Sequence, residues 1–325
     1  LCMLIEVCAD VAERERNTVM LGRTHGQAAV PITFGLKAAV WLDELRRQLI
    51  RLDEATPRII VGKFLGAVGT GAAQGDNARE LQRLIMTHLG LEVPLATTQV
   101  VGRDRYIEYV SWLANIAATC EKILQEIRNL QRSEIQEAGE GFEIKKQGGS
   151  STMAHKKNPI KSENASGLAR IVRSMIIPTY ENALLWHERD LANSSSERFT
   201  LSHGSALCED VISKTRQVLS NMWVDSERCL ENIKSQRGLV MAEKVMIELV
   251  EHGIARDEAH EILRSASFEA VEKKIELIDV CSRTPEIAAV FSADDLEAMF
   301  DPMNHIGVSG EIVDECVALA RKAIQ

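Results

Sequence analysis

The stretch "RDRYIEYVSWLANIAATCEKILQEIRNLQRSEIQE", residues 103 to 137, decides the fold of this chain. Its apolar residues recur at three- and four-residue steps: Ile107, Val110, Leu113, Ala117, Cys120, Leu124, Ile127 and Leu130. Glu, Lys and Arg stand between many of them, which is the pattern of an amphipathic helix. At 3.6 residues per turn, the stretch predicts a helix of about nine or ten turns, longer than an ordinary globular helix.

Two further stretches, residues 33 to 56 and 159 to 185, show similar helical spacing. The second is expected to begin with Asn158 as N-cap and Pro159 at the first helical position, and to kink at Pro178. Strand signals are almost absent, because β-branched alternation never persists and aromatic residues make up only 4% of the chain. The sequence therefore predicts an all-α protein built on a bundle of long helices.

Several of these helices carry apolar residues on more than one face, as in IVRSMII at residues 171 to 177. A helix that is apolar around much of its circumference must be buried, so packing between subunits is expected. After about residue 236 the pattern changes to shorter helices, ending with SGEIVDECVALARKA at 309 to 323. We therefore expect a long-helix bundle domain over residues 1–235 and a smaller C-terminal helical domain over residues 236–325.

Composition and charge limit the classes of protein that fit. The 325 residues are 45% hydrophobic, and no apolar run approaches the ~18 residues of a membrane span. The start, LCMLIEVCADVAERERN, has acids where a signal peptide would carry bases, so a cytoplasmic protein with no membrane partner is expected. A net charge of −9 argues against nucleic-acid binding. The seven cysteines form no CxxC pair, which suggests reduced, buried thiols rather than a metal site or disulfides.

Positive charge is nevertheless concentrated around "KKQGGSSTMAHKKNPIKSEN", residues 145 to 164. From Glu143 to Arg173, seven basic residues stand against two acidic ones, a local charge of +5. Gln147 to Ser151 has two adjacent glycines and no helical apolar pattern, so we expect a flexible loop that closes over a substrate. A glycine-rich surface loop beside a solvated lysine face is the alternative.

A second stretch, GRTHGQAAVPITFG at residues 22 to 35, places His25 between Thr24 and Gly26. We expect a turn between helices there, from which an imidazole projects into a cleft and titrates near neutral pH. A histidine that forms a hydrogen bond at a helix end is the alternative.

Two more stretches carry polar side chains suited to ligands. In TTQVVGRDRYIEY, residues 97 to 109, Gln99 precedes a charged helix start, although such charges are more often found at helix termini than in binding sites. WHERDLANSSSERF, residues 186 to 199, offers hydroxyls and guanidinium groups that suit a phosphate or carboxylate: Arg189, Ser194, Ser195, Ser196 and Arg198. A run of N-capping serines is the alternative.

These motifs together resemble a known family. GSSTMAHKKNP is similar to the signature of the fumarase/aspartase superfamily, whose usual form is GSSxMPxKxNP. With GRTHGQ, GAVGT (66 to 70), TQVVGRDR and WHERDLANSSSER, the chain resembles the adenylosuccinate lyase family in particular. The resemblance runs from about residue 15 to the C-terminus, where GLVMAEKVMIEL and DPMNHIG resemble the C-terminal domain of that family.

The resemblance implies a fold and a reaction. A homotetramer with a central long-helix bundle and active sites shared between subunits is expected, acting on small-molecule substrates. β-Elimination would release fumarate from adenylosuccinate, giving AMP, and from the succinylated aminoimidazole carboxamide ribotide (SAICAR), giving AICAR. A base and an acid on opposite sides of the substrate suffice for this chemistry, so neither a metal nor an organic cofactor is expected.

The resemblance also assigns roles to residues. Ser150 matches the catalytic base, and its alkoxide would be stabilised by loop amides and nearby cations. His25 matches the general acid that protonates the leaving nitrogen. Lys156 and Asn158 match ligands of the substrate carboxylate. The full set of expected substrate-binding residues is Thr24, Gln99, Ser151, Lys156, Asn158, Arg189, Ser194 and Arg198.

The chain departs from the family pattern in two places. Ala154 stands where the signature usually has proline, which should loosen the turn without removing a functional group. The family normally has a segment before a sequence like LCMLIEVCADVAERE, and that segment carries a second active-site histidine and nucleotide-binding residues. The N-terminal family domain is thus expected to be largely absent from this chain, which leaves either a truncated form or an incomplete nucleotide site.

Other functions remain open from the sequence. VPITFGLKAAVWLDEL and GAVGTGAAQGD also resemble 3-carboxy-cis,cis-muconate cycloisomerase, which typically lacks the histidine of the THG position. Argininosuccinate lyase has a related serine-loop signature but not WHERD. A catalytically silent structural homologue is the third interpretation. The presence of Ser150, His25, Lys156 and Asn158 argues against it.

Overall fold

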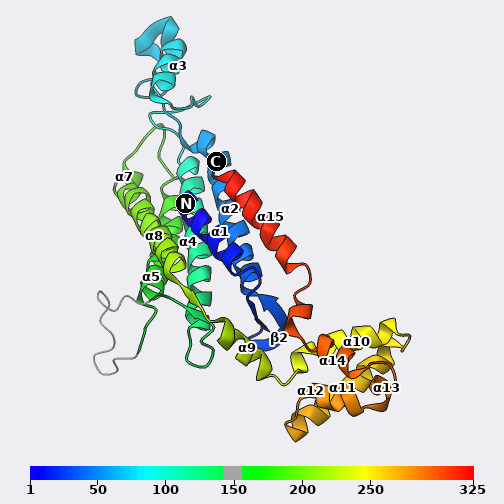
Figure 1. Cartoon of the computed structure of the whole chain (residues 1–325). Coiled ribbons are helices and arrows are strands. Elements are labelled where there is room, and N and C mark those ends of the chain that lie inside the picture. The colour runs from blue at the N-terminus through cyan, green and yellow to red at the C-terminus, as the bar shows by residue number, and fades with distance from the viewer. Residues whose placement is uncertain (142–155) are drawn as a thin grey trace.

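The computed structural model describes residues 1–141 and 156–325. Long helices pack along one another and form the body of the molecule (Figure 1). They are α1 (Cys2–Arg14), α2 (Phe34–Ile59), α4 (Asp104–Leu130), α5 (Ile160–Ser174), α8 (Gly204–Asn221) and α15 (Ser309–Ala323). Their facing sides share one hydrophobic core, which includes Leu42, Ile123 and Leu219. The expected all-α long-helix bundle is confirmed.

Helix α4 is central to the bundle and contacts α2, α5 and α8. Every apolar position predicted to face the core is buried except Ile107, which is half-buried. The helix ends at Leu130, earlier than the expected residue 137. A polar turn follows it, in which Gln136 adopts a φ of 55°.

The stretch expected as one kinked helix forms α5 and then α6 (Ile176–Glu181). The break lies at Met175, three residues before Pro178. Proline has no N–H to donate to the carbonyl four residues earlier, that of Ser174, so the helix is interrupted there. The expected kink is therefore present, and its cause is Pro178.

The start of α5 differs from the expectation. The predicted cap by Asn158 is wrong, because the helix begins at Ile160 and no residue just before it supplies a side-chain cap. The carboxylate of Glu140 accepts hydrogen bonds from the backbone N–H groups of Lys161 and Ser162 instead. A distant carboxylate therefore does the work that an N-cap residue ordinarily does.

A β-hairpin stands where a turn between helices was expected. β1 (Val19–Thr24) and β2 (Gln27–Thr33) pair in antiparallel fashion. His25 and Gly26 between them have positive φ angles of 54° and 74°, as a type I′ turn requires. The turn at His25 is thus present, but it joins strands rather than helices.

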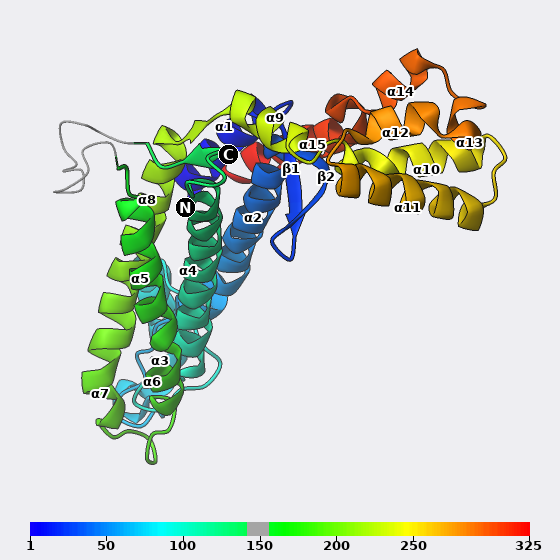
Figure 2. The same ribbon diagram turned by 90° about the horizontal axis from the view of Figure 1, so that it is seen from below.

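The second hydrophobic core lies in a smaller unit formed by α10 (Ala242–Glu251), α11 (Arg256–Lys273), α12 (Leu277–Arg283), α13 (Pro285–Ala288) and α14 (Ala293–Met299). Figure 2 shows this unit projecting from one end of the bundle.

The predicted division of the chain at residues 235/236 stays a prediction, but α15 does not lie with the smaller unit as expected. Val313, Val317 and Ala320 recur at helical spacing and are buried in the bundle core, where α15 contacts α1 and α2. The chain therefore leaves the bundle after α9 (Ser226–Lys234) and returns to it with α15.

Shorter elements complete the described part of the chain. They are α3 (Ala78–Leu89), α7 (Ala192–Glu197), the strand pair β3 (Ala138–Gly139) and β4 (Trp223–Val224), the 3₁₀ turns at Ala72–Asn77, Leu239–Met241 and Pro302–His305, and a π-helical turn at Arg198–His203. Within residues 1–141 and 156–325, none of the helices has the length and hydropathy that a membrane span requires. Most of the thiols are buried as expected, and burial raises the pKa of Cys120 to about 12.

Candidate active site

Apart from Thr24 and His25, the predicted site residues that the structure describes fall at opposite ends of α4. Gln99, Arg189, Ser194 and Arg198 lie near its first residue, and we call them the α4-start group. Lys156 and Asn158 lie near its last residue, and we call them the α4-end group. Ser150 and Ser151 lie outside the described residues.

The α4-start group is assembled from two segments that are distant in sequence. The backbone N–H of Gln99 donates to the carbonyl of Glu188 at 3.2 Å, which joins the TTQ segment to the WHERD segment. A largely buried ion pair holds the same segments together, since Arg103 Nε lies 2.9 Å from Glu197 Oε1 and their side chains are 9% and 15% exposed. Asn193 donates to that carboxylate at 2.8 Å. These contacts bring Gln99 and Arg189 into neighbouring loops.

The GAVGT loop packs against the same place. A Cβ atom on Gly69 would lie 1.9 Å from the carbonyl oxygen of Thr97, and Gly69 has a φ of 84°. Only glycine fits both the conformation and the close approach. The three motifs GAVGT, TTQVVGRDR and WHERDLANSSSER thus meet at one end of the bundle.

Asp190 organises the loop that carries Arg189. Its carboxylate accepts hydrogen bonds from the backbone N–H groups of Trp186 and Ala192, the latter at 2.7 Å. These bonds favour the charged form and lower the pKa of Asp190. Arg189 Nε donates to the Asp190 carbonyl at 2.9 Å. Arg198 is exposed and Ser194 is half-buried, so both side chains are accessible from solvent.

The α4-end group lies in a cationic cavity of about 690 Å³. The cavity is lined by Arg128, Gln131, Arg132, Ser133, Gln136, Lys156, Lys157, Asn158, Pro159 and Trp223. Among the described residues, the lining contains four basic side chains and no carboxylate, so its field attracts an anion. Lys and Asn side chains supply the charged and neutral donors that a carboxylate accepts.

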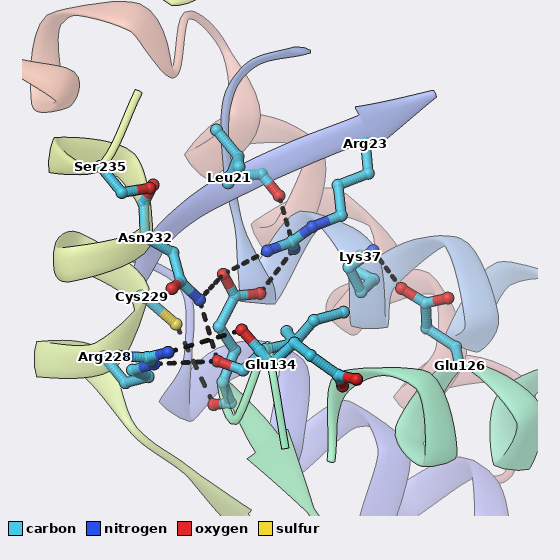
Figure 3. Close-up of polar contacts among 11 residues, drawn as sticks. Leu21, Arg23, Lys37, Glu126, Glu134, Arg228, Cys229, Asn232 and Ser235 are labelled. Carbon is cyan, nitrogen blue, oxygen red and sulfur yellow. Dashed lines mark hydrogen bonds and ion pairs between the residues drawn. The ribbon is translucent and has the colours of Figure 1, made fainter. Parts of the chain in front are cut away.

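His25 lies in neither group. Its hairpin is anchored near the end of α4 by an ion pair with a fully buried carboxylate, shown in Figure 3. Arg23 donates two hydrogen bonds of 2.7 Å to Glu137, whose side chain is fully buried. Asn232 of α9 donates to the same carboxylate at 2.8 Å. Thr24 and His25 follow directly on this anchored strand, and both are exposed.

Three residues that shape the site were missed by the sequence reasoning: Arg23, Glu137 and Glu140. Arg23 stands inside the GRTHGQ motif, so its position was a usable signal. Glu137 and Glu140 flank the dipeptide Ala138–Gly139, and all four residues are buried. Glutamate is almost never fully buried unless it is paired, but burial itself could not be read from this short polar stretch.

Comparison with known proteins connects these motifs to a family. A family model described as lyase matches residues 1–174, and one described as adenylosuccinate lyase C-terminus matches residues 238–316. The adenylosuccinate lyase of Archaeoglobus fulgidus is 43% identical to this chain, covering 99% of it and 72% of that protein. The enzyme of the same name from Aquifex aeolicus is 38% identical, and the match covers 92% of this chain and 68% of that protein. The chain belongs to the adenylosuccinate lyase family.

Solved structures agree with the wider superfamily of this adenylosuccinate lyase family member. A fumarate lyase from Mesorhizobium sp. BNC1 superimposes with a TM-score of 0.88 at 32% identity, covering 97% of this chain and 70% of that one. A 3-carboxy-cis,cis-muconate lactonizing enzyme from Pseudomonas putida gives 0.90 at 28% identity, covering 100% and 71%. These structures support the fumarase-type fold, and the adenylosuccinate lyase relatives confirm the expected place among the carbon–nitrogen lyases of the fumarase/aspartase superfamily.

Proposed function

We propose that this protein cleaves adenylosuccinate to AMP and fumarate, and SAICAR to AICAR and fumarate, as a cytoplasmic homotetramer. The observation that carries the proposal is the 43% identity to an adenylosuccinate lyase along 99% of the chain. The separate match of residues 238–316 to the C-terminal region of that family supports the same reaction. No metal or organic cofactor takes part in the proposed chemistry.

The proposed reaction begins with loss of a proton from the carbon next to a substrate carboxylate. Ser150, as alkoxide, takes this proton, and the electron pair moves into the carboxylate to give a doubly charged intermediate. Lys156 and Asn158 bind that carboxylate within the cationic cavity, where their donors stabilise the added charge. Ser151 completes the contacts on this side of the substrate.

The second step breaks the C–N bond. The electron pair of the intermediate forms the double bond of fumarate, and the departing nitrogen takes a proton from His25. An exposed imidazole at a hairpin turn suits this role, because it is accessible to a substrate held by another part of the protein. Thr24, beside it, binds the substrate near the leaving nitrogen.

The nucleotide part of the substrate is assigned to the α4-start group, with Ser194 and Arg198 at the phosphate. Helix α4 has 27 residues, which at 1.5 Å per residue separates its two ends by ~40 Å. One substrate molecule cannot contact both groups of a single chain across that distance. We therefore propose that each active site combines the α4-start group of one subunit with the α4-end group of another.

A lyase assay on the full-length protein tests the proposed function. With adenylosuccinate or SAICAR we expect fumarate and the corresponding nucleotide in equal amounts, and Ser150→Ala should lower turnover by several orders of magnitude while substrate still binds. The likeness to the lactonizing enzyme makes carboxymuconate the informative competing substrate. Turnover of carboxymuconate without cleavage of either nucleotide would assign the protein to that chemistry instead.

A further inference from the structure

The segment that carries Lys156 and Asn158 is held by one buried carboxylate. Glu140 is 4% exposed, and its Oε1 accepts from the Lys161 N–H at 3.1 Å. Its Oε2 accepts from the Ser162 N–H at 3.0 Å and from the Ser162 hydroxyl at 2.9 Å. Both oxygens are therefore directed at the first turn of α5. A negative charge at this place also interacts favourably with the helix dipole.

Gln131 connects Glu140 to the segment of the α4-end group through two hydrogen bonds. Its Nε2 donates to the carbonyl of Lys157 at 3.0 Å, and its Oε1 accepts from the Glu140 N–H at 2.9 Å. One amide side chain thus joins the backbone of Lys157 to that of Glu140. Lys157 lies between the two proposed carboxylate ligands, so their backbone is fixed from Gln131 on one side and from Glu140 on the other.

The capping arrangement has a chemical consequence for Asn158. An asparagine just before a helix ordinarily turns its side chain back to accept from the first helical N–H groups. Glu140 already occupies those N–H groups, so Asn158 does not cap α5 and instead lines the cationic cavity beside Lys156. The buried glutamate therefore spares the amide of Asn158 for a ligand.

We infer that Glu140, assisted by Gln131, is a positioning residue that holds Lys156 and Asn158 in the geometry that binds the substrate carboxylate. This inference rests on the proposed function, since it assigns the carboxylate of the substrate or of fumarate to the cationic cavity. Glu140 touches no substrate in this scheme. It acts through Asn158 and the backbone of Lys157.

Glu140→Gln tests the inference, because it replaces one acceptor oxygen by an NH₂ group that faces backbone donors. With adenylosuccinate as substrate, we expect KM and the inhibition constant of added fumarate to rise about tenfold, which equals ~1.4 kcal/mol of binding. The kcat value should fall as well, since the same donors stabilise the added charge of the intermediate, whereas fumarate inhibition reports on their position without the chemical steps. Where Glu140→Gln folds poorly, Gln131→Leu should raise the same two constants while the Glu140 carboxylate keeps its partners on α5.

Ser166→Ala is the matched control. Ser166 is buried one turn further along α5 and donates to the Ser162 carbonyl at 2.7 Å, so this variant also loses one buried hydrogen bond of the helix. Its fumarate inhibition constant should stay at the wild-type value. A purely structural role of Glu140 predicts equal changes in the two variants, and that result would overturn the inference.

A double-mutant comparison separates positioning from an independent effect. If Glu140 acts through Asn158 and the neighbouring backbone, then the loss of fumarate binding in the Asn158→Ala, Glu140→Gln double variant should be smaller than the sum of the two single losses. Strictly additive losses would contradict the inference while leaving the lyase activity established. A wild-type protein that cleaves neither nucleotide would overturn the proposed function and, with it, the role of Glu140.

Discussion

The two ends of α4 hold their proposed ligands in different ways. At the end of the helix, fully or almost fully buried carboxylates anchor the backbone, as Glu137 does for the hairpin and Glu140 does for α5. At its start, loops meet through a backbone hydrogen bond from Gln99 and through the Arg103–Glu197 pair. A buried charge with a full set of partners fixes the geometry around it. Losing one of those partners strongly destabilises the fold. The proposed charge-stabilising donors thus lie beside carboxylates that are more deeply buried than Glu197 at the other end.

The largest effect should come from removing a proposed substrate-binding cation at either end of α4. Lys156→Ala removes a cation from the α4-end group and Arg198→Ala removes one from the α4-start group, and each should lower kcat/KM by about 100-fold or more. Because we propose that a site takes one group from each of two subunits, co-expression of the two variants should restore part of the activity. Mixed oligomers that remain as inactive as either parent would show that each chain supplies both groups to its own site.

The next effect concerns the end of α4 at which Glu137 and Glu140 are buried. Arg23→Leu leaves Glu137 buried without its guanidinium, and we expect the free energy of unfolding to fall by ~3–5 kcal/mol in urea denaturation. Lys37→Leu is the control, since the Lys37–Glu126 pair beside it in Figure 3 spans 2.7 Å with both side chains partly exposed. Loss of such a pair should cost at most about 1 kcal/mol. Equal losses in the two variants would contradict the contrast between a pair with a fully buried carboxylate and one with a partly exposed carboxylate.

The smallest effect belongs to the loop at the start of α4. The pKa of Asp190 is lowered by the N–H groups of Trp186 and Ala192, so its stabilisation of the loop is complete above the ordinary aspartate value of about 3.9. That stabilisation is lost as the pH falls through the lowered pKa, when the carboxylate takes up a proton. Hydrogen exchange of the Ala192 amide, corrected for its intrinsic rate, should therefore accelerate at acidic pH.

Asp190→Asn should remove this pH dependence and raise KM for adenylosuccinate only a few-fold, because Arg189 keeps its place in a looser loop. Protection of the Ala192 amide that is unchanged down to pH 3 in the wild-type protein would show that the carboxylate does not hold the loop.

The long helices could be predicted because their burial repeats along the sequence. Seven of the eight apolar positions named for α4 are buried, and the interruption before Pro178 follows from the missing N–H of proline. The hairpin could not be predicted from alternation, since four successive residues of β1 are buried and the first four of β2 are not. A two-residue His–Gly turn was its local signal, and Gly26 marks the positive φ that such a turn needs.

Less of the site than of the fold could be predicted from the sequence. Motif resemblance indicated His25, Lys156 and Asn158, but spacing alone said nothing of the distance between them. The capping role was assigned to the neighbouring Asn158, whereas Glu140 fills it from twenty residues before the helix begins. Local rules favour the nearest suitable side chain, and tertiary packing brought a stronger acceptor to the same N–H groups.

The return of α15 to the bundle makes the unit of α10 to α14 an insertion with two attachments rather than a tail. Arg321 of α15 forms ion pairs with Asp10 at 2.9 Å and Glu13 at 3.0 Å on α1, so the first and last helices are fastened together (Figure 1). Removing α15 would strip the bundle of Val313, Val317 and Ala320. Deleting the unit of α10 to α14 and joining the chain across the gap should leave the bundle able to fold. Deleting α15 from the C-terminal end should not.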